Sequence, residues 1–477
     1  MICFGTGGWR AVIGDEFIKR NIRLVARALC IRMMQEGCAE KGIILGYDRR
    51  FLSKEAMQWC GEVFAGAGIP ALLVNKASPT PLIMFYVKEH DLPYGMMITA
   101  SHNPALYNGI KIFTAGGRDA DVRFTGGLEQ IIASLDPDDM PSMDYTEALQ
   151  KGLIQEIYPL NEYLDRILSM LDMDAIRQAH LRVALDPMYG VSEFPLKTLL
   201  YTGRCEVETI HDTHDTLFGG KMPAPDASTL RHLISQVMDY RFHIGIATDG
   251  DADRLGVIDD TGRYLHANDV LVLLYYYLVR YKGLHGPVVR NLATTHMLDR
   301  IAERFGEKCY EVPVGFKYIS AKMSEVDALI GGESSGGLTV RGHINGKDGI
   351  YAAMMLIEMI AVTGRKISQI CRDIEEECGV SHMVERSLSM TLQEKEHIKR
   401  LLSEGSAMPD FSFPVGHISY LDGCKVYFEN GGWVLARFSG TEPLLRIFCE
   451  MPSEADASRI CSILEYHLTG KDPGQTS

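Results

Sequence analysis

The chain has 477 residues, of which 46% are hydrophobic and 23% charged, and its formal net charge is -14. This length is too great for one hydrophobic core and predicts three or four domains in an ordinary globular protein. The acidic balance argues against general affinity for nucleic acids or anionic membranes. An anionic substrate stays open, because it needs only local positive groups.

Cysteine usage and the apolar runs predict a cytoplasmic protein. The eleven cysteines are scattered without a CxxC pair, which is typical of reduced thiols. Residues 1–5 show no basic region followed by a long apolar stretch, so we expect no signal peptide. The longest apolar runs, near 270–279 and 352–362, are too short to span a bilayer. We therefore expect no membrane partner and no nucleic-acid partner.

The first three regions of the chain alternate strand-like and helix-like segments, which predicts three α/β domains, over 1–140, 141–258 and 259–375. A polar segment with two prolines, 136–141, sets the first boundary, and the turn sequence 259–262 sets the second. The expected strands are 42–47, 69–74, 95–99, 109–113, 182–185, 207–210, 243–247, 287–290 and 329–330, and the expected helices are 54–65, 125–134, 268–281, 295–305 and 348–362.

The last hundred residues show a different order of segments, which predicts an α+β domain over 376–477. Strand-like runs at 416–420, 425–429, 432–438 and 444–450 follow one another, and Asp422-Gly423 is a hairpin turn signal between the first two. A helix at 454–467 closes the pattern.

The first of four polar loops, Thr99-Ala100-Ser101-His102-Asn103-Pro104, follows an expected buried strand. A serine at a strand end is where an α/β protein exposes a nucleophile, so Ser101 is a candidate nucleophile or phosphate acceptor. His102 is adjacent but, as a chain neighbour, is not automatically its base. Lys111 could supply a positive charge or an acid/base group. Taken alone, these residues are more often a capped turn and a solvated surface lysine.

The second loop carries Asp249, Asp251 and Asp253, which alternate with small residues after an apolar strand. Alternate residues of an extended segment face the same way, so three carboxylates repel one another unless a cation lies between them. The hard cation Mg²⁺ suits carboxylate oxygens and a phosphate. The alternatives are a solvated acidic turn and a calcium loop. The calcium match is poor, because Arg254 and Asp260 stand where that loop needs glycine and glutamate.

The third and fourth loops suit a sugar and a phosphate. Glu333 and Ser335 lie between two glycine pairs, and a carboxylate beside a hydroxyl suits vicinal hydroxyls of a sugar; a flexible glycine turn is the alternative. The fourth loop combines hydroxyls, a glycine turn and arginines, which a phosphate dianion requires, and the alternative is a polar hairpin turn. Its candidate residues are Arg437, Ser439, Gly440, Thr441 and Arg446.

Taken in this order, the four loops resemble those of the α-D-phosphohexomutase superfamily, the phosphoglucomutases and phosphomannomutases. Phe4-Gly5-Thr6-Gly7-Gly8-Trp9-Arg10 resembles the opening motif of that family, whose arginine reaches the active site. Pro313-Val314-Gly315-Phe316-Lys317 resembles the third-domain loop that distinguishes two sugar orientations. The resemblance extends from residue 4 to about residue 450.

The resemblance implies three related α/β domains and a C-terminal α+β domain around a central cleft. It implies that Ser101 carries a phosphoryl group and that one Mg²⁺ is held by this group, Asp249, Asp251 and Asp253. It further implies that Ser101, His102, Lys111, Arg10 and Arg254 act in catalysis, that Gly315, Lys317, Glu333, Ser335, His343 and Lys347 bind the sugar, and that Arg437, Ser439, Gly440, Thr441 and Arg446 bind the non-reacting phosphate.

The implied enzyme is an isomerase that interconverts hexose 1-phosphate and hexose 6-phosphate. The phosphoserine donates to a sugar hydroxyl, the resulting 1,6-bisphosphate turns over, and its other phosphate returns to Ser101. Glucose 1,6-bisphosphate would be the activator, and a small sugar phosphate the partner. Closure of the fourth domain through residues 437–446 would exclude water from the phosphoserine.

Two departures from the family pattern bear on the sugar. The opening reads GGWR where many members have DGIR, and Gly337 stands where phosphoglucosamine mutases and many bacterial dual-specificity enzymes have histidine. The segment 343–349 resembles the phosphoglucomutase version, in which His343 and Lys347 approach the substrate. This favours glucose, with mannose still open. The alternatives are a phosphoglucosamine or phosphopentose mutase, a metal-dependent phosphatase, and a noncatalytic sugar-phosphate-binding protein. Either a monomer or a homodimer is compatible with the sequence.

Overall fold

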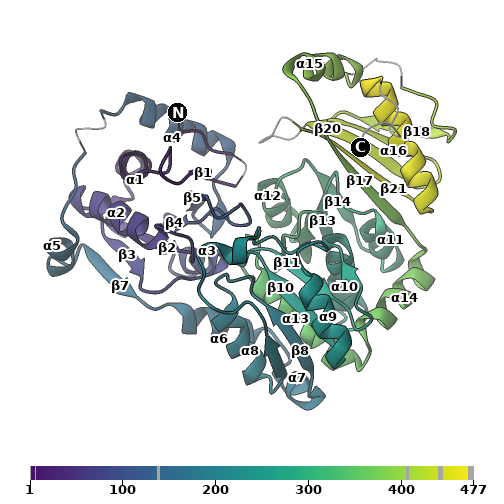
Figure 1. Ribbon diagram of the computed structural model, residues 1–477, viewed down its shortest axis with the longest axis horizontal. Helices are drawn as coiled ribbons and strands as arrows, with labels where there is room; N and C mark the ends of the chain where they lie inside the picture. The colour runs from purple at the N-terminus through teal and green to yellow at the C-terminus, as the bar shows by residue number, and fades with distance from the viewer. Residues whose placement is uncertain (1, 6, 137–139, 404–407, 439–443, 471–477) are drawn as a thin grey trace.

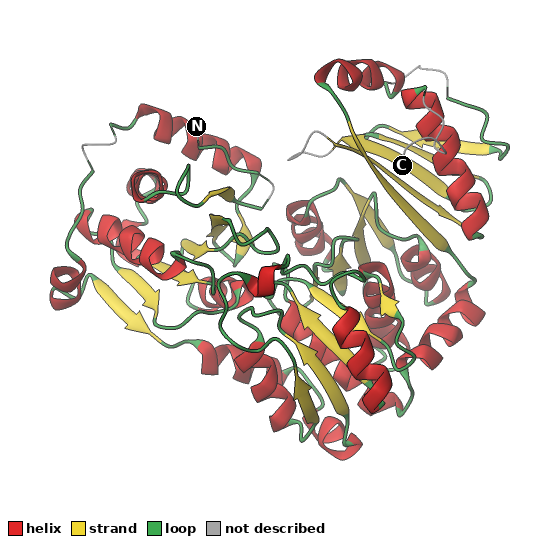
Figure 2. Ribbon diagram, in the orientation of Figure 1, coloured by secondary structure: helices red, strands yellow, loops and turns green. Residues whose placement is uncertain are grey.

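The computed structural model describes residues 2–5, 7–136, 140–403, 408–438 and 444–470. These residues form three consecutive α/β units and a fourth, α+β unit (Figures 1 and 2). In Figure 1 the first unit lies at the left and the fourth at the upper right, with the other two between them. The architecture confirms the predicted fold class.

The first sheet has the order β1-β5-β4-β2-β3-β7, with β6 paired to β5. Strands β4, β2, β3 and β7 are parallel, whereas β5 runs antiparallel to both β4 and β1. The strands are β1 (Trp9–Val12), β2 (Ile43–Tyr47), β3 (Ala71–Val74), β4 (Tyr94–Ile98), β5 (Tyr107–Thr114), β6 (Arg118–Asp119) and β7 (Ile154–Ile157); the helices are α1 (Lys19–Gln35), η1 (Ala39–Lys41), α2 (Ser53–Gly66), α3 (Thr80–Glu89), α4 (Val122–Ser134) and α5 (Tyr145–Gln150).

Strand β7 lies beyond residue 140, where we predict the first domain to end. It pairs with β3 in parallel, so the first sheet takes a strand from the segment after the two prolines. The polar segment is therefore a connection within the first sheet rather than its end. A short edge strand with a distant partner leaves little local signal in a sequence.

The second sheet has the order β12-β11-β10-β8-β9, and the third has the order β14-β13-β15-β16. The second unit contains α6 (Leu160–Ser169), α7 (Met173–Ala179), β8 (Arg182–Asp186), α8 (Glu193–Thr202), β9 (Glu206–Thr209), η2 (Phe218–Gly220), α9 (Arg231–Tyr240), β10 (Ile244–Thr248), β11 (Leu255–Ile258) and β12 (Tyr264–Leu265). The third contains α10 (Ala267–Arg280), β13 (Val288–Asn291), α11 (Met297–Arg304), β14 (Cys309–Val312), α12 (Phe316–Val326), β15 (Ile330–Gly332), β16 (Leu338–Val340), α13 (Gly349–Thr363) and α14 (Ile367–Cys378).

The three α/β units share one topology around their site loops. In each unit a strand with a parallel partner on one side (β4, β10 or β15) pairs on the other side with the strand that follows it, antiparallel (β5, β11 or β16). The loop joining each antiparallel pair is a predicted site loop. Equivalent positions in three repeated units therefore carry the serine, aspartate and glutamate loops.

The fourth sheet is antiparallel throughout, with the order β17-β21-β20-β19-β18. Its elements are β17 (His382–Ser389), α15 (Leu392–Leu401), β18 (Val415–Ser419), β19 (Cys424–Phe428), β20 (Trp433–Phe438), β21 (Leu444–Met451) and α16 (Glu454–Thr469). Helix α16 packs on this sheet around its own apolar cluster.

One large apolar cluster joins the first three units, and helix α13 lies in its centre with every residue from 349 to 360 buried. Burial on all sides is typical of an interior helix, and the one charged residue of α13, Glu358, is paired with Lys282 at 2.8 Å. Within the described residues, no helix combines the length and the apolar character that a bilayer crossing requires.

Candidate active site

Ser101 lies at the end of β4 with its side chain buried and its backbone in the left-handed region, at a φ of 52°. This conformation is unusual for a residue with a Cβ and is held only where the surroundings fix it. The Ser101 N–H donates to Oγ1 of Thr99 at 2.8 Å. The Ser101 hydroxyl donates to Oδ2 of Asp249 at 2.6 Å. The serine loop of the first unit thus meets the aspartate loop of the second.

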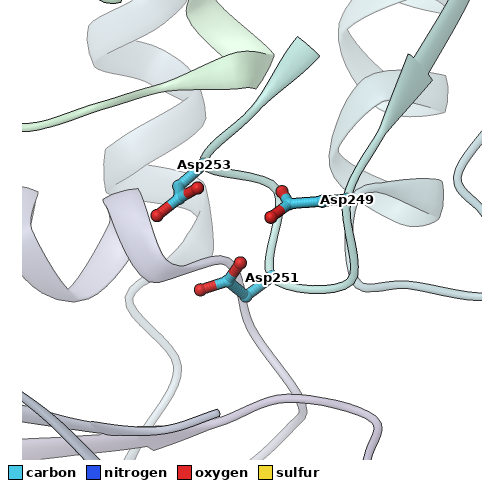
Figure 3. Close-up of side chains that lie close together, drawn as sticks. All are labelled: Asp249, Asp251 and Asp253. Atoms are coloured by element: carbon cyan, nitrogen blue, oxygen red, sulfur yellow. The ribbon is translucent and has the colours of Figure 1, made fainter. Parts of the chain in front are cut away.

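Asp249, Asp251 and Asp253 are all buried, and each can offer an oxygen within 4.8 Å of the other two (Figure 3). Burial, followed by repulsion from Asp251 and Asp253, raises the pKa of Asp249 well above its usual range. Oδ1 of Asp251 and Oδ1 of Asp253 are buried without a hydrogen-bond partner among the described residues. Buried carboxylate oxygens that lack donors fit a hard divalent cation.

Lys111 of β5 is buried against these carboxylates rather than solvated. Its Nζ donates to Oδ2 of Asp251 at 2.6 Å and to Oδ2 of Asp253 at 2.8 Å. Burial disfavours the ammonium, but the attraction of Asp251 and Asp253 outweighs it and raises the pKa of Lys111. Lys111 is therefore a fixed positive charge in this arrangement.

Three further cations surround the carboxylates. Nζ of Lys347 lies 3.4 Å from Oδ2 of Asp253. The Arg254 N–H donates to Asp249 at 3.0 Å, and its Nε lies 3.9 Å from Oδ1 of Asp253. Desolvation and repulsion from Arg254 lower the pKa of Arg10, which the charges of Asp251 and Asp253 oppose. With Lys111, four cations face three carboxylates, an arrangement that attracts an anion such as a phosphate.

His102 lies beside the serine, with Nδ1 3.3 Å from Oγ of Ser101. Desolvation, with repulsion from Arg254 and Arg10, lowers the pKa of His102 to about 2. The imidazole is therefore neutral at physiological pH, and it does not add to the positive charge of the site.

The glutamate loop lies next to the carboxylate cluster. The Ser335 hydroxyl donates to Glu333 at 2.6 Å, and the Asn291 amide approaches the other oxygen of Glu333 at 3.4 Å. A Cβ placed on Gly336 would lie 3.7 Å from Cβ of Arg254, which shows how near the two loops come. The carboxylate of Glu333 and the hydroxyl of Ser335 thus lie side by side in this loop.

The path of the Lys347 side chain requires a glycine at position 337. A Cβ at position 337 would lie 2.0 Å from Cδ of Lys347, so the stem of that lysine fills the space that a side chain would take. A histidine at position 337 is excluded while Lys347 keeps this path.

The predicted sugar-orientation loop leads into α12. Gly315 precedes the helix with a φ of 132°, a conformation that favours glycine. Nζ of Lys317 lies 5.0 Å from the centre of the Tyr318 ring. The Val314 N–H donates to Oδ2 of Asp422, a residue of the fourth unit, at 3.0 Å.

His343 occupies a different place from the one we predict. Its side chain is buried, with Nε2 2.6 Å from Oδ2 of Asp348, and the hydroxyl of Tyr163 donates to the same oxygen at 2.7 Å. Asp348 in turn caps the first turn of α13 through its other oxygen. His343 thus anchors a helix in the interior, and this buried position argues against contact with a substrate. His343 and Lys347 stand in the same short segment, so the sequence alone could not show that His343 anchors a helix whereas Lys347 approaches Asp253.

Arg437 and Arg446 are direct cross-strand partners in β20 and β21. Arg437 lies 3.4 Å from Asp422, and Arg446 lies 4.0 Å from Glu385. Two arginines side by side at this hairpin end offer the charge-assisted donors that an anion such as a phosphate requires. Ser439, Gly440 and Thr441 lie outside the described residues.

Two residues that interact with the charges of this site are not indicated by the sequence. The Thr80 hydroxyl donates to Oδ2 of Asp251 at 2.6 Å from the first turn of α3. Asp119 of β6 lies among the site charges. Burial raises its pKa, while Lys347 and Lys111 oppose the shift. Neither residue stands in a motif, and both reach the site only through the tertiary fold.

Comparisons with known proteins agree with this geometry. Family models of phosphoglucomutase/phosphomannomutase match alpha/beta/alpha domain I at residues 1–139, domain II at 161–262, domain III at 266–378 and the C-terminal domain at 398–465. The chain belongs to the phosphoglucomutase/phosphomannomutase family. Membership confirms the predicted α-D-phosphohexomutase superfamily and the enzyme class, an isomerase that acts as an intramolecular phosphotransferase.

Relatives within the phosphoglucomutase/phosphomannomutase family carry different names. A protein of Thermococcus kodakarensis named phosphoglucomutase/phosphomannomutase is 28% identical, covering 95% of each chain. A probable phosphoglucosamine mutase of Methanopyrus kandleri is 29% identical, covering 96% of this chain and 95% of the relative. The crystal structure of a putative phosphomannomutase from Thermus thermophilus superimposes with a TM-score of 0.83 at 28% identity, covering 98% and 99% of the two chains.

Proposed function

We propose that this protein interconverts hexose 1-phosphate and hexose 6-phosphate through a phosphoserine at position 101, with glucose preferred and mannose also accepted. The observation that carries the proposal is the 2.6 Å hydrogen bond between Ser101 and Asp249, beside three buried carboxylates and the four cations that surround them. A hydroxyl in such a setting is placed to exchange a phosphoryl group.

The three carboxylates and the Ser101 oxygen would hold one Mg²⁺. When bound, the cation would offset negative charge on the transferring phosphoryl group. Lys111 would hold Asp251 and Asp253 oriented in the same direction, because it donates to both. Arg10 and Arg254 would face the phosphate oxygens, since both lie beside the carboxylates without being fully neutralised by them.

Proton transfer needs a group near the sugar hydroxyl. The closest candidate is Lys347, whose ammonium lies beside Asp253 and whose stem crosses Gly337. Because the Ser101 hydroxyl donates its single proton to Asp249, a neutral His102 would donate from Nδ1–H to Oγ of Ser101, and we assign it the orientation of that hydroxyl. Asp249 would accept the proton of Ser101 when the phosphoryl group returns, because its Oδ2 already accepts the hydrogen bond of that hydroxyl.

Sugar and phosphate recognition would involve the third and fourth units. Glu333 and Ser335 would bind sugar hydroxyls, with Gly315 and Lys317 at the other end of the sugar. Arg437 and Arg446, together with Ser439, Gly440 and Thr441, would hold the phosphate that is not reacting. Because the bisphosphate must turn over, one phosphate site has to serve both poses of the sugar.

The choice of sugar rests on Lys347. The segment 343–349 resembles the phosphoglucomutase version, in which Lys347 approaches the substrate, and this favours glucose. The phosphoglucosamine alternative is favoured by a different observation, namely that several relatives of similar identity bear that name. We propose a cytoplasmic enzyme activated by glucose 1,6-bisphosphate, as a monomer or homodimer.

The test is turnover of glucose 1-phosphate, mannose 1-phosphate and glucosamine 1-phosphate by the purified protein with Mg²⁺ and a trace of the matching 1,6-bisphosphate. The proposal expects 6-phosphate product without free phosphate, fastest with glucose, and none in Ser101→Ala. Release of free phosphate would indicate a phosphatase. Faster turnover of glucosamine 1-phosphate would replace the glucose assignment.

A further inference from the structure

The turn between β2 and α2, Asp48-Arg49-Arg50, contacts both loops that meet at Ser101. Asp48 and Arg50 are buried beneath the serine loop of their own unit, whereas Arg49 reaches the second unit, which carries Asp249. None of these three residues stands in a motif that points to the site. We refer to them as the 48–50 turn.

Arg50 holds the serine loop by its backbone. Its guanidinium donates to four carbonyl oxygens of that loop, at distances between 2.6 and 3.0 Å. The planar fork of an arginine presents five N–H donors, which a lysine cannot reproduce. The acceptors are the carbonyl groups of Ser101, Asn103, Pro104 and Tyr107.

Asp48 completes the support from below. It accepts hydrogen bonds from the Thr99 hydroxyl at 2.7 Å and from the Arg50 N–H at 2.9 Å. Thr99 accepts from the Ser101 N–H, so a chain of hydrogen bonds runs from Asp48 to the backbone of the serine. Both sides of the Ser101 residue are thus fixed, the N–H through Thr99 and the carbonyl through Arg50. This explains how Ser101 keeps a positive φ.

Arg49 fastens the same turn to the second unit. Nη2 of Arg49 lies 3.2 Å from Glu193 in α8, and Nη1 donates to the Asp212 carbonyl at 3.3 Å. The Arg49 carbonyl lies 3.1 Å from Nε2 of His214. The Arg50 guanidinium also faces the Phe218 ring of the second unit, 4.9 Å from its centre. The turn therefore bonds to both sides of the boundary that the Ser101–Asp249 hydrogen bond crosses.

The two loops are in close contact at this boundary. A Cβ on Gly250 would lie 2.9 Å from the Ser101 carbonyl oxygen, the same oxygen that accepts from Arg50. Small displacements of the first unit against the second would therefore change the distance from the Ser101 hydroxyl to Asp249. A misplacement of about 1 Å costs a reaction about 100-fold in rate.

We propose that the 48–50 turn is a positioning device, in which Arg50 and Asp48 fix the conformation of Ser101 and Arg49 sets the serine loop against the aspartate loop. These side chains do not touch the reacting atoms. The kinetic part of the proposal rests on the proposed phosphotransfer at Ser101, whereas the structural part does not.

The experiment compares Arg50→Lys, Arg49→Met and the wild-type protein, with Arg20→Lys on the exposed start of α1 as a matched control. Amide hydrogen exchange is measured over residues 99–108, together with kcat, KM and the melting temperature. Arg50→Lys is expected to raise exchange in this loop at least tenfold and to lower kcat about 100-fold, with KM for the sugar phosphate within about twofold. Arg49→Met is expected to lower kcat about tenfold with loop exchange unchanged, because it acts between the units.

Unchanged exchange in Arg50→Lys, or unchanged kcat in both variants, would overturn the proposal. If Arg50→Lys does not fold, Thr99→Val breaks the link from Asp48 to Ser101 and takes its place. If the wild-type protein turns over no sugar phosphate, the proposed function fails by itself. Titration with Mg²⁺ then replaces kcat, and the positioning role predicts at least tenfold weaker Mg²⁺ binding in Arg50→Lys, whereas equal binding would overturn it.

Discussion

The Ser101 hydroxyl donates to Oδ2 of Asp249 at 2.6 Å, although 148 residues separate the two in the chain. The serine belongs to the first α/β unit and the aspartate to the second, and each lies in the loop that joins the equivalent antiparallel strand pair. Repetition of one topology thus brings a hydroxyl and a carboxylate face to face. A phosphoryl group on Ser101 would lie among the three aspartates.

Replacing Lys111 by methionine should make the folding stability of the protein depend strongly on Mg²⁺. The variant leaves the buried carboxylates of Asp251 and Asp253 without their shared donor, which costs about 3–5 kcal/mol without a cation. Added Mg²⁺ should recover a larger share of the unfolding free energy in Lys111→Met than in the wild-type protein. Urea unfolding with Mg²⁺ and with a chelator measures this. Lys54→Met, on the exposed start of α2, is the control, and an equal Mg²⁺ effect in all three proteins would contradict the site.

Substituting Arg437 by alanine should weaken substrate binding without weakening the fold. The variant relieves repulsion between two arginines that face each other across β20 and β21, but it also removes the Arg437–Asp422 ion pair. These effects oppose each other, so the unfolding free energy should change by no more than about 0.5 kcal/mol. The dissociation constants of hexose 1-phosphate and hexose 6-phosphate should both rise, by about tenfold, because one phosphate site serves both. Calorimetric titration of the Ser101→Ala background measures this. A rise for only one of the two sugar phosphates would show that the two poses use different sites.

Gly337→Ala should lower kcat by displacing Lys347. The new Cβ would lie 2.0 Å from Cδ of that lysine, so the stem must move away from its path and take the ammonium with it. If Lys347 is the acid/base group, kcat should fall about 100-fold at an unchanged Mg²⁺ requirement. Gly126→Ala is the control, because a Cβ at that helical position meets nothing within 4 Å. Equal kcat in the two variants would remove Lys347 from the proton-transfer step.

A buried ionic cluster joins the third and fourth units around Lys425 of β19. Nζ of Lys425 donates to the Leu292 carbonyl at 2.7 Å and to Glu311 at 2.7 Å. Burial, with repulsion from Arg290, lowers the pKa of Lys425 to about 7, which Glu311 opposes. The charged and titratable groups that face it are Arg290, His296, Asp299, Glu311 and Tyr427.

This shift predicts a pH dependence of stability. In the unfolded chain the Lys425 amine keeps its ordinary pKa of 10.5, so between pH 7 and that value the unfolded state holds more protons than the folded state. The contribution of Lys425 to the unfolding free energy must then rise with pH, by about 2 kcal/mol between about pH 7 and about pH 9. Urea unfolding of the wild-type protein and of Lys425→Met measures the difference between their slopes. A wild-type slope equal to or below that of Lys425→Met would contradict the shift.

The sequence predicted the class of each unit well, because periodicity and turn residues act locally. The hairpin at Asp422-Gly423, the strands leading into the site loops and the helix at 348–362 all correspond to observed elements. The strands that the sequence analysis missed pair with strands far away in the chain. β7 is a short edge strand whose partner is β3, and β17 pairs with β21 across most of the fourth unit. Neither pairing can be read from a local window.

The site residues divide in the same way, into those that the local sequence indicates and those that only the tertiary fold brings to the site. Ser101 and the three aspartates stand in continuous loops after apolar strands, where residue type and spacing carry the chemistry. The sequence left two interpretations of Lys111, a solvated surface lysine or a group of the site. Its burial against Asp251 in the fold excludes the solvated surface lysine. Thr80 and the 48–50 turn act through hydrogen bonds formed by the tertiary fold. His343 has the residue type of a ligand group but the surroundings of a helix anchor, which the sequence cannot distinguish.

The most direct test of the central claim is to locate the phosphoryl group. The protein is incubated with glucose 1,6-bisphosphate and Mg²⁺, and the peptides are mapped by mass spectrometry before and after addition of excess hexose 1-phosphate. The account predicts a phosphate on Ser101 that is lost to the sugar in the second step, and no phosphorylated peptide in Ser101→Ala. A phosphate on another residue, or sugar isomerisation with Ser101 never phosphorylated, would contradict it.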